Sequence, residues 1–205
     1  MNNWSKGTRV KFQNTRNHLT AYSPGLRFED LTEAGLSNYA IHLREVKYLQ
    51  NSTIIKQIKL LKWFLRWATV KGYCQTLDYI NFKPKLKTTE KKIVFLDWAE
   101  LMTIYNYPFT DKQKTLERVR DVFCFCCFTS LRYSDVANLK RSDVFDGHIS
   151  LTTIKTADSI KIELNKYSRA ILDKYADQQY PGNRALPVIS NQKMNDYLKE
   201  MGKIC

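Results

Sequence analysis

Apolar and polar residues alternate with the period of an α-helix through much of residues 1–92. The pattern is clearest between Asn51 and Gly72, where apolar positions recur at intervals of four, three, four and three residues: Ile54, Ile58, Leu61, Leu65 and Ala68. This spacing lines one face of a helix. Asn51 and Ser52 are residue types that cap helix N-termini, and Gly72 stands where a C-terminal cap is expected. We therefore predict a helix between these caps.

Two more helices are predicted before this one. The first spans about residues 4–22 and ends before the turn-forming run Ser23-Pro24-Gly25. The second spans about residues 30–47 and carries apolar residues at helical spacing: Leu31, Ala34, Leu36, Tyr39, Ala40 and Leu43. The first part of the chain is therefore predicted to be a helical bundle.

Helices are also predicted in the second part of the chain. One lies near residues 97–107 and ends at Pro108, and a longer one spans about 112–128. The last part of the longer helix, 122–128, is apolar on every side, which is typical of a helix buried all round. Two more helices are predicted near residues 166–178 and 191–203.

A β-hairpin is predicted between these helices. Residues 148–154 and 159–164 each alternate between apolar and polar side chains, as strands do. The two runs are joined by residues 155–158, and Lys155 lies at the exit of the first strand. The second part of the chain is therefore predicted to be α+β, although the chain as a whole is mainly α.

The positive charge is concentrated in the first part of the chain. The 205 residues carry 33 Lys and Arg against 20 Asp and Glu, a formal net charge of +13. Residues 1–92 hold 17 of the basic and 6 of the acidic residues, a net charge of +11, which leaves +2 for residues 93–205. Residues 83–92 are rich in lysine and have no helical period. We therefore predict a helical unit over 1–82, an exposed basic linker over 83–92 and a second unit over 93–205.

Composition excludes several classes of protein. Hydrophobic residues make up 43% of the chain, enough for a packed core, so wholesale disorder is excluded. No apolar run approaches the roughly 20 residues that cross a bilayer, and the first residues form no signal peptide. We therefore expect a cytoplasmic protein that does not contact membranes. The pI near 9.5 favours a polyanionic partner, with nucleic acid preferred to anionic lipid.

Cysteine usage indicates reduced thiols. The chain has five cysteines, an odd number, and Cys124, Cys126 and Cys127 crowd into four positions. This is not the pattern of a disulfide framework. Neither a zinc-finger histidine pair nor a second C-x-x-C is present, and cysteine often serves as a small apolar core residue, so no metal is expected.

The helix predicted after Asn51 also carries a basic stripe. Its members are spaced by three, three and four residues: Lys56, Lys59, Lys62 and Arg66. Such a stripe is often only a solvated surface, but the excess charge of this unit favours contacts with phosphates. The linker extends this candidate DNA-binding surface through Lys83, Lys85 and Lys87. Trp63, Phe64 and Trp67 lie on the same helix, and we interpret them as packing residues rather than as platforms for stacked bases.

One short segment carries candidate chemistry. It follows the buried helix directly, with the sequence Thr129-Ser130-Leu131-Arg132-Tyr133-Ser134-Asp135. An arginine in the turn after a buried helix is held by a rigid scaffold, close to buried surface. Ser134 is expected to cap a short helix that begins at Asp135.

The arrangement of these segments resembles the tyrosine recombinases, or phage integrase family. The first catalytic box of that family is T-G-L-R, followed by a small or polar residue and then an acid, and residues 129–135 are similar to it. The family also carries a lysine in a β-hairpin, commonly as Lys-Thr, where this chain has Lys155-Thr156. Residues 51–68 resemble the core-binding domain of integrases from the Bacteroides group. The resemblance therefore spans essentially the whole chain.

The resemblance implies a fold and a chemistry. It implies a SAM-like helical core-binding domain followed by the first part of an α+β catalytic domain, which together clamp double-stranded DNA at an attachment site with other recombinase protomers. Arg132 would hold the non-bridging oxygens of the attacked phosphate, and Lys155 would protonate the departing 5′ oxygen. Asp135 would orient the turn that carries Arg132. Neither a metal nor another cofactor is implied, because cationic side chains neutralise the phosphate.

The chain departs from the family in two respects. Ser130 stands where the family favours glycine, and a positive φ there would add modest strain. The second catalytic box of the family, His-x-x-Arg, and the nucleophilic tyrosine should follow the helix near 191–203, but the sequence ends at Cys205 before them. We therefore expect a C-terminally truncated recombinase that binds DNA and is inactive alone.

Two other classes of function remain open. One is a non-catalytic DNA-binding regulator of a mobile element, with residues 134–139 as part of a helix-turn-helix. It would require specific binding by residues 93–205, whose charge of +2 makes this less favourable. The other is a helical interaction protein whose basic face meets an acidic protein. Salt-sensitive DNA binding would separate it from a recombinase.

Overall fold

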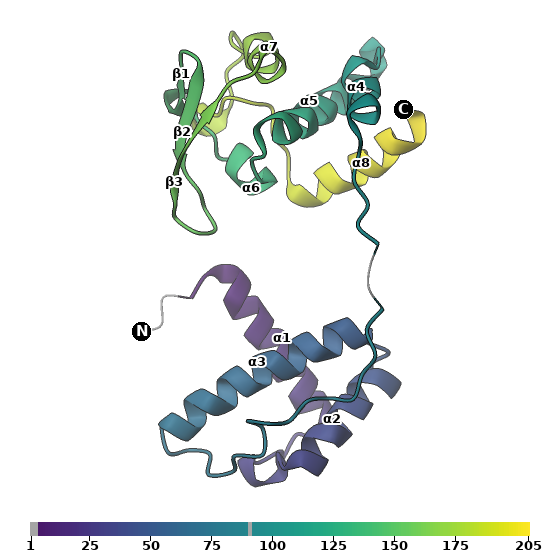
Figure 1. Cartoon of the computed structure of the whole chain (residues 1–205), viewed down its shortest axis with the longest axis vertical. Coiled ribbons are helices and arrows are strands. Elements are labelled where there is room, and N and C mark those ends of the chain that lie inside the picture. The colour runs from purple at the N-terminus through teal and green to yellow at the C-terminus, as the bar shows by residue number, and fades with distance from the viewer. Residues whose placement is uncertain (1–3, 90–91) are drawn as a thin grey trace. The chain divides into compact units, whose positions relative to one another are not determined.

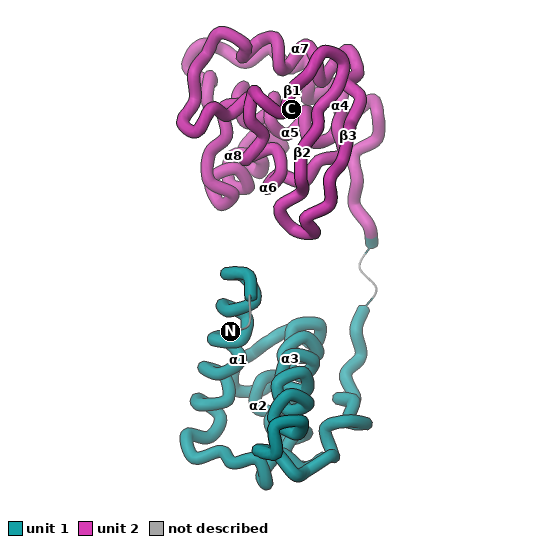
Figure 2. Tube along the Cα trace, turned by 90° about the vertical axis from the view of Figure 1, so that its left-hand side faces the viewer, with its two compact units in different colours: residues 1–92 teal, residues 93–205 magenta. Residues whose placement is uncertain are grey.

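The computed structural model describes residues 4–89 and 92–205. The chain divides into two compact units, Met1–Lys92 and Ile93–Cys205 (Figure 2). Each unit has its own cluster of buried apolar side chains. We describe the units separately.

Unit 1 (Met1–Lys92) is a helical bundle. Its helices are α1 (Lys6–Tyr22), α2 (Glu33–Glu45) and α3 (Asn51–Val70), with a short 3-10 turn at Phe28–Asp30 before α2 (Figure 1). The core includes the entire apolar stripe predicted on α3: Ile54, Ile58, Leu61, Leu65 and Ala68. The periodicity of the sequence therefore predicted both the helix and the face that it buries.

The sequence predicted the C-terminal cap of α3 correctly and its N-terminal cap wrongly. Gly72 has a φ of 76°, and its N–H donates to the carbonyl of Thr69 while the N–H of Tyr73 donates to that of Ala68. This pair of bonds is the Schellman cap that the glycine indicated. The predicted N-cap was wrong, because Gln50 occupies the cap position and Asn51 is already helical. The Asn51 side chain instead donates to the carbonyl of Lys87 at 2.7 Å.

Unit 2 (Ile93–Cys205) combines helices with a small sheet. Its helices are α4 (Trp98–Asn106), α5 (Lys114–Thr129), α6 (Tyr133–Val136), α7 (Lys166–Lys174) and α8 (Asn191–Ile204). Its antiparallel sheet has the order β1 (Val144–Phe145), β2 (His148–Thr152) and β3 (Ser159–Glu163). The β2–β3 pair is the predicted hairpin, with His148 opposite Glu163 and Thr152 opposite Ser159.

Helix α5 is the central helix of unit 2, although it is not buried on every side as predicted. Val122, Cys124 and Phe125 are fully buried, but Cys127 is exposed. The prediction was wrong at Cys127. An apolar run shows which side chains are suited to burial, but it does not show on how many sides other elements pack against the helix. Helices α4, α7 and α8 all pack against α5.

A buried ion-pair network fixes α5 to α7. The Arg120 guanidinium donates to the Asp121 carboxylate at 2.8 Å and to the carbonyl of Tyr107 at 2.6 Å. The same carboxylate accepts from the ammonium of Lys174 at 2.7 Å and from the hydroxyl of Tyr175 at 2.6 Å. Because charged groups this deeply buried are costly unless they are paired, the network specifies one packing of the two helices.

Helix α7 ends earlier than the sequence indicated, at Lys174 rather than near residue 178. The guanidinium of Arg141 donates to the carbonyls of Tyr175, Ala176 and Gln178. It therefore holds the turn that follows the helix by satisfying three of its backbone acceptors.

The segment after unit 1's helices carries no regular structure over residues 83–89. Its apolar residues are partly buried, and Leu86 packs against the core of unit 1. Part of the predicted linker, residues 90 and 91, lies outside the described residues. The division into 1–82, 83–92 and 93–205 stays a prediction.

Candidate functional site

The candidate catalytic turn begins where α5 ends. Ser130 closes the helix with a φ of 57° and a ψ of 15°, a left-handed conformation. Before it, the hydroxyl of buried Thr129 donates to the carbonyl of Phe125 at 2.6 Å. After it, Leu131 returns into the core at 6% exposure. The turn is therefore anchored on both sides of a residue whose conformation favours glycine.

Arg132 follows this turn and takes the N-cap position of α6. Its backbone is extended, and its carbonyl accepts from the N–H groups of Asp135 and Val136. The prediction that Ser134 caps this helix was wrong, because the helix begins at Tyr133 and Ser134 lies inside it. The N-cap is the last residue with non-helical φ and ψ before the helix. Here that residue is Arg132, two positions after the left-handed turn at Ser130, and not Ser134.

Asp135 connects the Arg132 turn to the β-hairpin. Its side chain is 3% exposed, and Oδ1 accepts a hydrogen bond from the backbone N–H of Ile154 at 2.9 Å. Ile154 directly precedes Lys155. A buried carboxylate that accepts a backbone bond fixes the spacing of the two segments, since leaving either group unpaired is costly.

The hairpin turn that carries Lys155 is itself internally bonded. The N–H of Thr153 donates to the carbonyl of Asp158 at 2.9 Å, and the N–H of Asp158 donates to the hydroxyl of Thr153 at 3.2 Å. The hydroxyls of Thr153 and Thr156 are 2.8 Å apart. These bonds close the turn around Lys155, whose side chain is exposed.

The structure therefore links two exposed cations through one buried anion. In the part of the chain that the structure describes, neither the Arg132 side chain nor the Lys155 side chain makes a hydrogen bond or an ion pair. Both are available to an anionic ligand. A guanidinium presents paired donors to phosphate oxygens, and an ammonium can donate a proton to a leaving oxygen.

Two cysteines of the cluster behind this turn, Cys124 and Cys126, are poor candidates for reactive thiols. Burial, followed by the neighbouring Cys127, raises the pKa of both Cys124 and Cys126 to about 12. Thiols with raised pKa values stay protonated near neutral pH and are poor nucleophiles and poor metal ligands. Among residues 4–89 and 92–205, no group of His, Cys, Asp and Glu could hold a metal ion.

The basic stripe on α3 has one member with a structural contact. The ammonium of Lys62 donates to the carbonyls of Ile80 and Phe82, each at 2.9 Å. Burial, followed by repulsion from Lys83 and Arg66, lowers its pKa. Lys62 therefore holds the returning segment against α3. The other three members of the stripe are exposed: Lys56, Lys59 and Arg66.

The candidate DNA-binding lysines of the returning segment alternate in exposure. Lys83, Lys85 and Lys87 are exposed, whereas Pro84 and Leu86 between them are partly buried. Lys83 lies close enough to Lys62 to affect its pKa. The structure thus brings the first of these lysines beside the stripe on α3, and both sets belong to unit 1.

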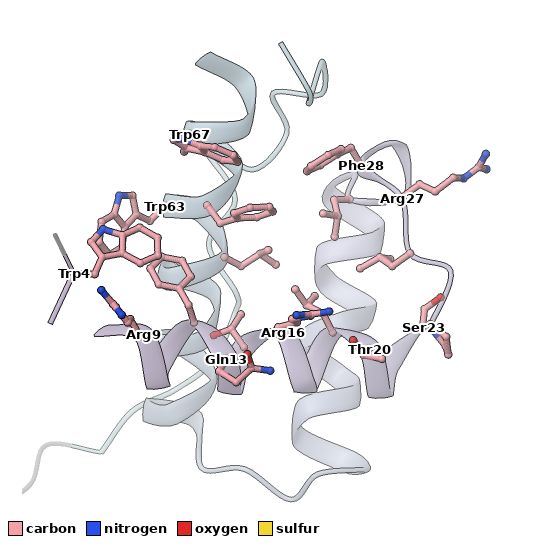
Figure 3. A pocket seen from close by; sticks show the side chains of 18 residues that line it. Trp4, Arg9, Gln13, Arg16, Thr20, Ser23, Arg27, Phe28, Trp63 and Trp67 are labelled. Atoms are coloured by element: carbon pink, nitrogen blue, oxygen red, sulfur yellow. The ribbon is translucent and has the colours of Figure 1, made fainter. Parts of the chain in front are cut away.

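An aromatic groove in unit 1 was missed from the sequence. It lies between α1, α3 and the segment that follows α1 (Figure 3). Trp63, Phe64 and Trp67 line it at 36% exposure or more, so the interpretation that they serve mainly as packing residues was incomplete. Their spacing on α3, off the apolar stripe, was the available signal.

A family comparison identifies the first unit. Residues 1–84 match the phage integrase SAM-like domain. Unit 1 contains a phage integrase SAM-like domain. This match confirms, for unit 1, the resemblance of the sequence to the phage integrases. No curated protein matches this chain at the level of its sequence.

Solved integrases share the fold over nearly the whole chain. A lambda integrase dimer bound to a COC' core site has a TM-score of 0.79 at 16% identity, covering 98% of this chain and 72% of that one. A lambda integrase tetramer bound to a Holliday junction has a TM-score of 0.77 at 17% identity, covering 98% and 60%. The Tn1549 transposon integrase in complex with circular intermediate DNA has a TM-score of 0.73 at 16% identity, covering 100% and 75%. The predicted fold class, mainly α with an α+β second unit, is confirmed.

No helix in the described part of the chain has the length and apolar character needed to cross a membrane.

Proposed function

We propose that this chain is the DNA-binding portion of a site-specific tyrosine recombinase that acts in DNA integration. The observation that carries the proposal is the bond between Asp135 and the backbone of Ile154, which holds the Arg132 turn and the Lys155 hairpin at a fixed spacing. An integrase SAM-like domain in unit 1 and the integrase fold support the same function.

Unit 1 supplies the affinity for duplex DNA. Exposed Lys56, Lys59 and Arg66 on α3 and the lysines of 83–87 contact phosphates, so binding is largely independent of sequence and falls steeply as salt rises. Lys62 contributes by shaping this surface, because its ammonium is occupied by two carbonyls.

Unit 2 supplies the catalytic cations. In the complete enzyme a tyrosine oxygen attacks a backbone phosphorus, the bond to the 5′ oxygen breaks, and a 3′-phosphotyrosyl link forms. Arg132 stabilises the charge that develops on the non-bridging oxygens, and Lys155 gives its proton to the departing 5′ oxygen. Asp135 acts through these two residues as a positioning residue.

The 205 residues alone bind DNA without cleaving it. They contain no His-x-x-Arg sequence, which the resemblance implies as the second catalytic box. Other recombinase protomers are the expected partners on DNA, as in the lambda integrase dimer and tetramer structures. A covalent adduct between these residues and a nicked suicide duplex would contradict the predicted inactivity.

Duplex affinity at a series of salt concentrations tests the function. We expect Lys56→Glu with Lys59→Glu to weaken binding and to reduce the slope of log affinity against log salt by about 2. The matched control is Lys112→Glu with Lys193→Glu, two exposed lysines of unit 2, which should leave the slope nearly unchanged. Equal effects of the two pairs, or binding that ignores salt, would contradict the proposal.

A further inference from the structure

The groove of unit 1 has an aromatic floor that nothing in its proposed DNA contacts uses. It has a volume of about 920 Å³ and runs along α1 and α3 (Figure 3). Six aromatic residues line it: Trp4, Phe12, Phe28, Trp63, Phe64 and Trp67. Three of the four tryptophans of the chain are among them.

The floor is ordered and yet open to solvent. The rings of Trp4 and Phe12 stack with centroids 4.5 Å apart, and those of Phe12 and Trp63 lie 5.1 Å apart. Trp63 remains 49% exposed and Trp67 45% exposed. Aromatic side chains held in place before binding lose little entropy when a partner covers them, and such apolar patches mark interaction sites.

The rim of the groove is positively charged. Arg9 and Arg16 project from α1, and Arg27 comes from the segment after it (Figure 3). The eighteen lining residues include these three arginines and no carboxylate. Arg27 is 3.8 Å from Glu29 in a well-exposed pair, and neither Arg9 nor Arg16 makes an ion pair within the described ranges. An occupant with carboxylates beside its apolar groups would complement this rim.

The groove and the proposed phosphate-binding surface have different centres on α3. A helix turns by about 100° per residue, so the centre of the Trp63, Phe64 and Trp67 positions lies roughly 90° around α3 from the centre of the basic stripe, and the two sectors meet at Lys56. Contact with half-exposed aromatic rings does not stabilise a bound phosphate. Large apolar side chains, in contrast, bind favourably there because they remove the apolar surface of the rings from water. A second copy of unit 1 is disfavoured as occupant, because two such units, each carrying +11, repel each other.

We propose that this groove binds an acidic amphipathic helix of a partner protein. Large apolar side chains on one face of that helix would cover the tryptophans, and flanking Asp or Glu residues would pair with Arg9, Arg16 and Arg27. Helix α1 has 17 residues and is therefore about 25 Å long, which suits a partner helix of four or five turns. This interaction goes beyond the proposed DNA binding.

A designed peptide of about 18 residues tests the proposal, with Leu and Phe along one helical face and Glu elsewhere. The control peptide replaces every Glu with Lys and keeps the apolar face. We expect the acidic peptide to bind the full chain and change the fluorescence of the groove tryptophans, in the presence and absence of duplex DNA. Trp98→Phe, in unit 2, should preserve this signal because Trp98 lies outside the groove.

Two variants locate the binding site. Trp67→Ala and Arg16→Glu should each weaken binding by about tenfold or more, as anchors of an interface do. Arg44→Glu makes the same charge change on exposed α2 outside the groove and should bind nearly as the parent does. Far-UV circular dichroism checks that each variant is folded. If Trp67→Ala unfolds, the test uses Arg16→Glu, which changes an exposed side chain.

Four results would overturn the proposal. The first is equal binding of the Lys peptide, and the second is parent-like binding by both groove variants. The third is displacement of the peptide by duplex DNA together with loss of DNA affinity in Trp67→Ala, which would make the groove a nucleic-acid site. The fourth is self-association that Trp67→Ala abolishes, which would make a second copy the occupant.

Discussion

The carboxylate of Asp135 accepts a hydrogen bond from the backbone N–H of Ile154 at 2.9 Å, across 19 residues of sequence. This single bond joins the helix that follows Arg132 to the hairpin that carries Lys155. The bond fixes the backbone segments that carry the two cations, while the Arg132 and Lys155 side chains stay exposed.

Removing the Asp135 carboxylate should loosen the hairpin. Asp135→Ala leaves the N–H of Ile154 without its partner, which costs about 1–3 kcal/mol of unfolding free energy in unit 2. Asp135→Asn keeps an acceptor oxygen and should lose less. Hydrogen exchange of the Ile154 amide measures the effect directly. An amide that exchanges equally slowly in the parent and the alanine variant would show that the bond does not fix the hairpin.

Replacing Ser130 with glycine should stabilise unit 2. Its φ of 57° is a left-handed conformation that glycine adopts without strain, so Ser130→Gly should stabilise unit 2 by roughly 0.5–1 kcal/mol. The control is Ser134→Gly, at an exposed position inside α6, where glycine should destabilise. Urea unfolding compares the two variants. A loss of stability in Ser130→Gly would contradict the account of this turn.

Lys62 should behave differently from its neighbours on the stripe. Lys62→Met removes the donor to the carbonyls of Ile80 and Phe82 and should destabilise unit 1 by about 0.5–1.5 kcal/mol, because water can reach these partly exposed carbonyls. Lys56→Met, at an exposed position, should leave the free energy of unfolding nearly unchanged while it weakens DNA binding. Thermal unfolding and duplex affinity, measured on both variants, separate the two roles. Equal stability losses would mean that the tether contributes nothing.

Unit 1 should lose stability in mild acid. Burial, followed by repulsion from Lys47 and His42, lowers the pKa of His18 below its ordinary 6.5. The folded state therefore binds a proton less readily than the unfolded state, so stability is full above pH 6.5 and falls as the pH drops through it. Unfolding midpoints at pH 7.5 and pH 5 measure the loss. His18→Gln should reduce it, and His148→Gln in unit 2 should not.

Local features of the fold could be predicted from the sequence. The stripe from Ile54 to Ala68 and the cap at Gly72 depend on residues close together in the chain, and the structure has both. For Ser130, the glycine that the resembling family favours at this position indicated only that φ could be positive. The structure shows that it is positive.

Features that depend on distant segments could not be predicted. The bonds from Lys62 require residues 80–82 to return to α3, and the exposure of Cys127 depends on which elements pack around α5. The partner of Asp135 lies in another element, so the sequence suggested an orienting role without naming Ile154. The aromatic groove is formed by α1, the segment after it and α3. The sequence alone therefore did not show that Trp63 and Trp67 line a groove.

The most direct measurement of the central claim is a backbone amide NMR titration of the full chain with a short DNA duplex. We expect the largest shifts at Lys56 and Lys59, at residues 83–87, and at Arg132 and Lys155, with little change at Arg141 and its contacts. That result would show one duplex engaging the basic surface and both cations. Shifts confined to unit 1, with Arg132 and Lys155 unmoved at saturation, would contradict the claim that these cations meet the DNA backbone.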